Sequence, residues 1–398
     1  MKHLKLITTG IAFSFFILTG CEKEPESITS PATAGFSAQH SSELQINADA
    51  LRASLPEGFE ERLQHSTVLL SNPDPQYRSM VNRALAIEED PNCDANTATS
   101  LWLDEQLADW FDANGRLDPN IAFALNLAAL DLPTYDALVF ENSSDNQYYG
   151  VKGQYTKQVT KAFKDLQRFW DISSEDIVLA AMHGSMLTNK AKVARTYEAV
   201  YGMPPAMAAV YADAMVELAS GIPQLRGGDH PIFTFNAFAL QGFNFGPYGT
   251  IPDKIIMGDG IMDAFAAVGY SDVAPQAILA HEFAHQIQYE LNLFGSEDSP
   301  EATRRTELMA DAYSAYYLSH ARGATMQWKR VQQFLQVFFN IGDCSFSSTG
   351  HHGTPTQRMA AAEWGYNLAN DAQKQGHIMS AQEFAERFDA HLSQLVML

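Results

Sequence analysis

Along most of the chain, apolar residues recur every three or four positions, the spacing that places them on one face of an α-helix. In the first half this spacing predicts helices at residues 96–111, 156–170, 174–187, 190–201 and 205–220. In the second half it predicts helices at 259–268, 273–291, 300–322, 325–340, 355–372 and 381–396. Glycine and proline residues separate these segments, as is typical of turns.

One short segment has a different pattern. Residues 254–259 contain a short apolar run bounded by Pro252 and Gly258, which favours a β-strand. The expected fold class is therefore α+β, mainly helical with a small sheet. We divide the chain into a helical region, residues 46–235, and a second region, residues 236–398, which contains all the candidate chemistry.

The first 20 residues predict a signal peptide. Lys2 and Lys5 give a positively charged start. The apolar stretch that follows, residues 6–18, is shorter than the roughly 20 residues needed to span a bilayer. Leu-Thr-Gly before Cys21 resembles the lipobox of bacterial lipoproteins, in which that cysteine is lipidated; a secretory signal with an incidental cysteine is the alternative. Residues 21–45 then read as a polar tether. We expect a protein of the bacterial cell envelope, anchored by lipid to a membrane through Cys21, at the outer membrane or the periplasmic face.

The charge of the chain excludes some partners. Without the predicted signal peptide it has 24 basic and 47 acidic residues, a formal charge of −23. Nucleic-acid binding depends largely on neutralising phosphates, so no nucleic-acid partner is expected. The excess of negative charge also disfavours electrostatic docking on anionic lipid. The oligomeric state is not predicted by any feature of the sequence.

The strongest chemical signal is the H-E-x-x-H motif His281-Glu282-Phe283-Ala284-His285. Residues four apart on a helix lie about 40° apart around its axis, so His281 and His285 face one metal ion. Glu282 points about 100° away, where it reaches a metal-bound water without binding the metal. Paired imidazoles suit zinc, and we expect Zn²⁺ as the cofactor. Two histidines that share a helix face by coincidence are the alternative.

A second predicted helix supplies a third ligand. Ser299 and Pro300 are typical N-cap and first-turn residues, and Glu307 and Asp311 follow four positions apart on one face. We assign Glu307 as the third zinc ligand and Asp311 as the acceptor for the imidazole N–H of His281. In the alternative, both carboxylates pair with Arg304 or with lysines on a solvated face.

These residues carry a resemblance to a known family. H-E-F-A-H-Q-I-Q, then E-L-M-A-D, then H-G-T-P-T-Q-R at 352–358 resembles the bacterial neutral zinc metallopeptidases, over roughly residues 250–365. The resemblance implies a zincin-like catalytic domain of the gluzincin type, with an active-site helix and a strand, 254–259, that forms the upper edge of the cleft and pairs with an extended peptide. Ala284 stands where the family usually has glycine, and Ala312 where it often has cysteine.

The same resemblance draws attention to His352. A gluzincin needs a donor for the oxyanion that forms as water attacks the peptide, and a loop before a helix at Thr354 is suited to this. We predict that His352 is this catalytic donor, with His351 as the second choice. In the alternative, His352 holds the loop by bonding a backbone carbonyl or Asp311.

Two functions are therefore open at this stage. The first is a membrane-tethered zinc metallopeptidase that hydrolyses peptide or protein substrates, with Glu282 as the general base. The second is a lipoprotein on a peptidase fold that acts as a binding or scaffold protein without hydrolysis. A structural zinc site is a weaker third, since such sites usually close with four protein ligands. Substrate and cleavage preference are not encoded in any recognisable motif.

The remaining cysteines give a separate prediction. If Cys21 is lipidated, Cys93 and Cys344 are left as an even pair in an oxidising compartment. A bridge and two separate buried thiols are both compatible with the sequence. Free-thiol titration under denaturing conditions decides between them: no reactive thiol is expected from a bridge, and two reactive thiols exclude it.

Overall fold

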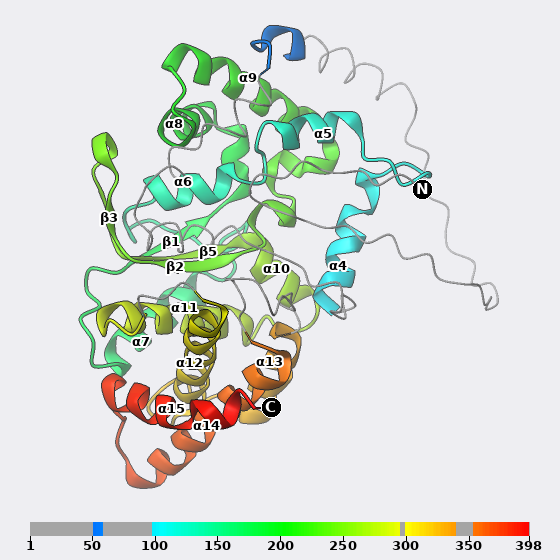
Figure 1. The fold of residues 1–398 in the computed structure, drawn as a ribbon. Helices are drawn as coiled ribbons and strands as arrows, with labels where there is room; N and C mark the ends of the chain where they lie inside the picture. Colours follow the sequence, from blue (N-terminus) through cyan, green and yellow to red (C-terminus); the bar gives the residue numbers. More distant parts are fainter. Residues whose placement is uncertain (1–50, 59–97, 295–298, 340–352, 398) are drawn as a thin grey trace, which may run out of the picture.

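The computed structural model describes residues 51–58, 98–294, 299–339 and 353–397, and the statements below concern these residues. A small sheet lies between two layers of helices (Figure 1). One layer contains α5 (Pro119–Asn126), α6 (Leu132–Phe140), α8 (Lys190–Tyr201) and α9 (Pro205–Gly221). The other contains α7 (Thr156–Phe169), α11 (Ala274–Glu290), α12 (Pro300–Ser319), α13 (Trp328–Phe338), α14 (Pro355–Gln375) and α15 (Ala381–Leu395). The mainly helical character with a small sheet agrees with the predicted α+β class.

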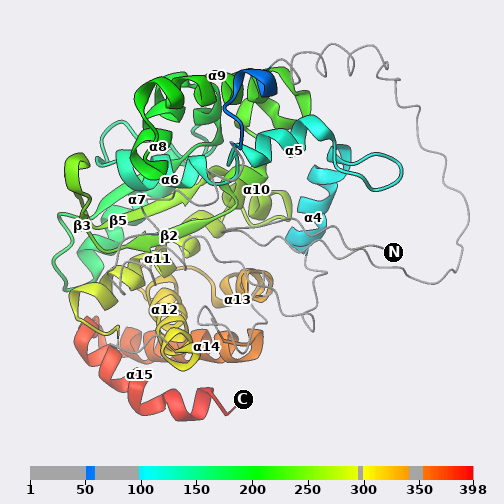
Figure 2. The ribbon, with the colours of Figure 1, turned by 45° about the horizontal axis from the view of Figure 1, so that its top comes forward.

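Each layer has its own apolar core against one face of the sheet. The central strand contributes to both, because Ile256 belongs to one core and Ile255 and Met257 belong to the other. This follows from the alternation of side chains along a strand. Figure 2 shows the two layers from a second direction, with α4 (Ala98–Leu107) and α10 (Asp259–Ala267) beside the sheet.

The three-stranded sheet has the order β1-β5-β2. β1 (Val178–Met182) is parallel to β5 (Lys254–Gly258), and β2 (Ala237–Leu240) is antiparallel to it. β5 confirms the predicted strand but corrects its role. It is paired on both sides, so it cannot offer free backbone groups to a peptide. The sheet also takes strands from both sides of residue 235, the predicted boundary; a short hairpin, β3 (Phe243–Asn244) and β4 (Thr250–Ile251), follows β2.

The predicted helix at 174–187 is wrong. Its residues form β1 and a short 3-10 helix, Gly184–Thr188. The apolar residues in β1 are consecutive, and an unbroken run of five fits a parallel strand covered on both faces better than one helix face. Two helices were also not predicted, α5 and α6. Pro133 lies in the first turn of α6, where proline is tolerated.

The outer edge of β1 is covered by side chains from one loop. Ser144 Oγ accepts from the backbone N–H of Leu179 at 2.9 Å, and Gln147 Oε1 accepts from that of Ala181 at 3.0 Å. The hydroxyl of Tyr149 donates to the carbonyl of Leu179. Edge strands with unpaired backbone groups can add foreign strands. This loop therefore satisfies the edge of β1 without adding a strand.

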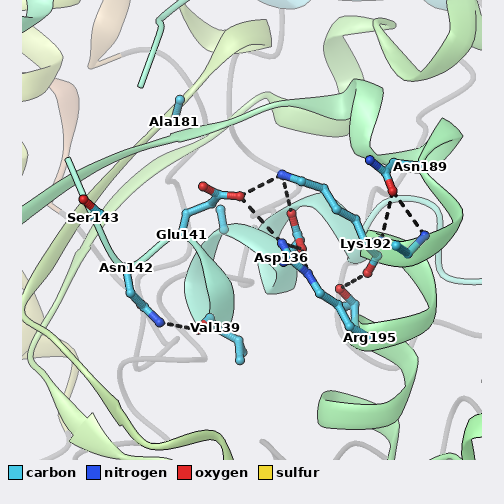
Figure 3. Close-up of polar contacts among 12 residues, drawn as sticks. Asp136, Val139, Glu141, Asn142, Ser143, Ala181, Asn189, Lys192 and Arg195 are labelled. Atoms are coloured by element: carbon cyan, nitrogen blue, oxygen red, sulfur yellow. Dashed lines mark hydrogen bonds and ion pairs between the residues drawn. The ribbon is translucent and has the colours of Figure 1, made fainter. Parts of the chain in front are cut away.

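A charge network around the buried Asp136 joins α6 to α8 (Figure 3). Asp136, 3% exposed, accepts from Nε and Nη2 of Arg195 at 2.9 and 2.6 Å. Lys192 lies 2.7 Å from Glu141 and 3.3 Å from Asp136. Two acids thus face two bases, as buried ions require. The network fixes α6, whose terminal carbonyls in turn accept from the buried ammonium of Lys254 on β5.

α12 and α14 lie in close contact in the other layer. A Cβ atom on Gly365 would lie 2.1 Å from the carbonyl oxygen of Ala312, so only glycine permits this approach. The starts of α14 and α15 carry capping boxes, complete in α14 and partial in α15. Thr354 and Gln357 exchange both bonds, and Ser380 Oγ accepts from the Glu383 amide. Among the described helices, none has the length and apolar character to cross a membrane.

Candidate metal centre

α11 lies in the interior of the protein, and every residue from Ala277 to Gln288 is buried. Gln286 fixes this helix to the sheet, because its Nε2 donates to the carbonyls of Leu240 at 3.0 Å and Lys254 at 2.8 Å. The side chain of Ser299 caps α12 by accepting from the Ala302 amide, as predicted. Two helices with defined positions therefore carry the candidate ligands.

The side chains of His281, His285 and Glu307 converge, and their ligand atoms all lie within 4.8 Å of one another. Nε2 of His281 lies 3.2 Å from Oε2 of Glu307, and Nε2 of His285 lies 3.4 Å from Oε1. All three side chains are buried. The alternative in which Glu307 pairs with cations on a solvated face is therefore excluded by its position.

Asp311 lies behind His281, as the sequence predicts. Its Oδ1 is 3.0 Å from Nδ1 of His281, although the geometry is not that of a well-directed hydrogen bond. Arg358 on α14 donates to both oxygens of Asp311, from Nε at 2.8 Å and from Nη2 at 2.9 Å. Arg358 belongs to the H-G-T-P-T-Q-R motif, but sequence reasoning gave it no role. Its guanidinium supplies the counter-charge that keeps a buried carboxylate beside the imidazole.

His285 has a different partner, which sequence reasoning missed. Its Nδ1 lies 2.9 Å from Oε1 of Gln288, and Nε2 of Gln288 donates to the carbonyl of Thr306 at 2.7 Å. Residues three apart meet on a helix face, so the H-x-x-Q spacing was a usable signal.

The Glu282 carboxyl group lies between the sheet, where it accepts from the Ala239 amide, and the charged groups of the ligand cluster. Burial raises the pKa of its carboxyl group, while the nearby histidines and a hydrogen bond from the Ala239 amide act in the opposite direction. The location of Ala239 explains this contact. Gly258 donates to Asn236 across the ladder, and hydrogen-bonded pairs alternate in antiparallel strands, so the Ala239 amide points outward from the edge strand β2.

The predicted donor His352 lies outside the described residues, as do Cys21, Cys93 and Cys344. The next residue, Gly353, has a φ of 95° and its α-carbon faces Leu308, the neighbour of Glu307. The chain thus reaches α12 immediately after His352. His230, in contrast, is a satisfied structural histidine, with Nε2 2.9 Å from the Gln106 carbonyl and Nδ1 accepting from Ile232.

The cluster has the dimensions of a metal site. Ligand atoms at about 2.0–2.1 Å from a tetrahedral zinc ion lie about 3.3 Å apart, close to the two nitrogen–oxygen distances above. Both imidazoles place Nε2 toward the Glu307 carboxylate, with Nδ1 of His281 beside Asp311 and Nδ1 of His285 beside Gln288. Burial lowers the pKa of His281, but Asp311 and Glu307 outweigh it and raise it to about 10.

Comparisons with known proteins identify no relative. No family model, no curated protein and no solved structure matches this chain. The chemistry of the site therefore rests on the positions of its own side chains: a buried group of two histidines and one glutamate that could hold a metal ion, with a second glutamate beside it.

Proposed function

We propose that this protein is a zinc metallopeptidase with a zincin-like catalytic domain. The observation that carries the proposal is the convergence of His281, His285 and Glu307, with Glu282 on the same helix beside an edge strand. Three ligands leave a fourth position for water or substrate, which distinguishes catalytic zinc sites from structural ones. Among the described residues no cysteine or fourth protein ligand closes the group.

Zinc, when bound, would polarise the scissile carbonyl and lower the pKa of a bound water to about 7. His281, His285 and Glu307 would hold it. Glu282 would take the proton of the attacking water and return it to the leaving amine. Because burial raises the pKa of Glu282, its carboxylate is a stronger proton acceptor than one in water.

The substrate would pair with β2, not with β5. β2 is at the edge of the sheet, and its outward-facing groups at Ala237 and Ala239 lie on the side of Glu282. An extended peptide that adds to such an edge is held by main-chain hydrogen bonds, with little dependence on its sequence. Addition along β2 would therefore bring a peptide backbone next to the proposed base.

The lipid anchor at Cys21 and the envelope location remain part of this proposal. A tether of residues 21–45 would hold the catalytic region at a membrane surface, with peptide or protein substrates reaching it from the envelope side. His352 remains the proposed oxyanion donor.

Zinc content and cleavage test the function together. Purified protein is expected to hold about one zinc ion per chain. Each of His281→Ala, His285→Ala and Glu307→Ala should lose it, because two remaining ligands bind weakly, whereas His391→Ala on α15 should retain it. Chelation should abolish cleavage of a mixed peptide library, and added zinc should restore it. Full zinc content in all three ligand variants would overturn the metal site, and a zinc-loaded protein that cleaves nothing would favour the scaffold function.

A further inference from the structure

Two buried glutamines on α11 have different partners. Gln286 and Gln288 are each 0% exposed. Gln286 donates to two backbone carbonyls of the sheet and contacts neither histidine. Gln288 lies between His285 and the carbonyl of Thr306, on the adjacent helix α12.

The Thr306 carbonyl determines the orientation of the Gln288 amide. A carbonyl oxygen only accepts, so the group 2.7 Å from it must be the Gln288 NH₂. The amide oxygen of Gln288 therefore faces His285, 2.9 Å from Nδ1. An amide oxygen also only accepts, so Nδ1 of His285 must carry a proton. In the neutral imidazole this leaves Nε2 unprotonated, with its lone pair toward Glu307.

We propose that Gln288 is a positioning residue that fixes the tautomer of His285 and so presents Nε2 as a metal ligand. The inference rests on the proposed metal site. It concerns the hydrogen bonds by which Gln288 connects the Thr306 carbonyl to the His285 imidazole. His281 is oriented by the Asp311 carboxylate; His285 is oriented by a neutral amide. The ligand set therefore gains no second buried negative charge behind the histidines.

The same hydrogen bond also couples the two ligand-bearing helices. Thr306 immediately precedes Glu307, so the Gln288 bond to the Thr306 carbonyl ties α11 to α12 next to the third ligand. The Gln288 side chain thus determines which nitrogen of His285 is protonated, and it holds the backbone next to Glu307 against α11. Loss of an outer partner of this kind typically weakens metal affinity about 10–100-fold.

Imidazole ¹⁵N chemical shifts in the metal-free full-length protein test the tautomer directly. Wild-type His285 is expected to be protonated at Nδ1, because the amide oxygen beside it can only accept. Gln288→Met keeps the side-chain length but removes the acceptor, and should shift His285 to a mixture or to the Nε2–H form. Gln288→Glu keeps an acceptor oxygen and should keep Nδ1 protonated. Gln286→Met, a matched loss of a buried glutamine on the same helix, should leave His285 unchanged.

Zinc affinity, measured by competition with a chelator, is the second readout. Gln288→Met should raise the zinc dissociation constant about 10–100-fold. Gln286→Met should leave it unchanged, even if both variants melt earlier. An Nε2–H imidazole in the wild type, or equal affinity losses in the two methionine variants, would overturn the role of Gln288. Failure of the peptidase proposal is distinguishable, because the ¹⁵N measurement needs neither zinc nor substrate.

Discussion

Replacement of Glu282 by glutamine is expected to lower peptide hydrolysis at least about a hundredfold, the usual scale for loss of a general base. Glutamine has the same shape and can still accept from the Ala239 amide, so the fold should be retained. It cannot take a proton from water at neutral pH. Zinc content should not change, because Glu282 is not one of the three converging ligands. Initial cleavage rates and zinc content of the same sample are the measurements.

Glu290→Gln is the matched control for this experiment. Glu290 ends the same helix, α11, beyond the segment of consecutive buried residues, and should tolerate the change without loss of activity. If Glu282→Gln cleaves peptides at the rate of the wild type, another group is the base. If neither the wild type nor Glu282→Gln cleaves any peptide, the binding or scaffold function is favoured.

Replacement of Arg358 by leucine is expected to lower the free energy of unfolding by about 3–5 kcal/mol, the usual cost of breaking a buried ion pair from one side. Asp311 is 1% exposed and Arg358 is 5% exposed, and removal of the guanidinium leaves a buried carboxylate without its counter-charge. The cation also lies 4.6 Å from the ring centre of Phe339, a contact that leucine does not replace. Urea unfolding measures the change.

Two further variants separate charge burial from other effects. Arg387→Leu removes an exposed pair with Glu383, one helical turn away, and should cost less than about 1 kcal/mol. Asp311→Asn combined with Arg358→Leu leaves no unpaired charge, and should be more stable than Arg358→Leu alone. A loss of less than about 1 kcal/mol in Arg358→Leu would mean that Asp311 is stabilised in another way.

The helices of the second region could be predicted from sequence because apolar residues recur along them every three or four positions and three of their starts carry caps. Ser299, Thr354 and Ser380 mark three of these starts, and all three act as caps. β1 was missed because its unbroken apolar run was interpreted as part of a longer helical segment, 174–187. Likewise, nothing in residues 254–259 indicates that two strands from distant segments would pair on either side of them.

The candidate site could be predicted in its helical spacing but not in its tertiary partners. The four-residue intervals place His281 near His285 and Glu307 near Asp311, and the structure brings the two pairs together. The pairing of Arg358 with Asp311 depends on how α14 crosses α12, which the sequence does not encode locally. Gln288 was missed because glutamine is common on exposed faces, and only the fold shows that this one is buried.

The side chains that cover the edge of β1 make the two edges of this sheet differ in their tendency to add a foreign strand. Strand exchange with neighbouring or unfolded chains begins at unpaired edges. Ser144, Gln147 and Tyr149 close one edge without the bulk of another strand. Among the described strands of this sheet, β2 is the edge left for a misfolded chain to join, next to Glu282. Under the proposed function, an added chain would be cut at that same edge.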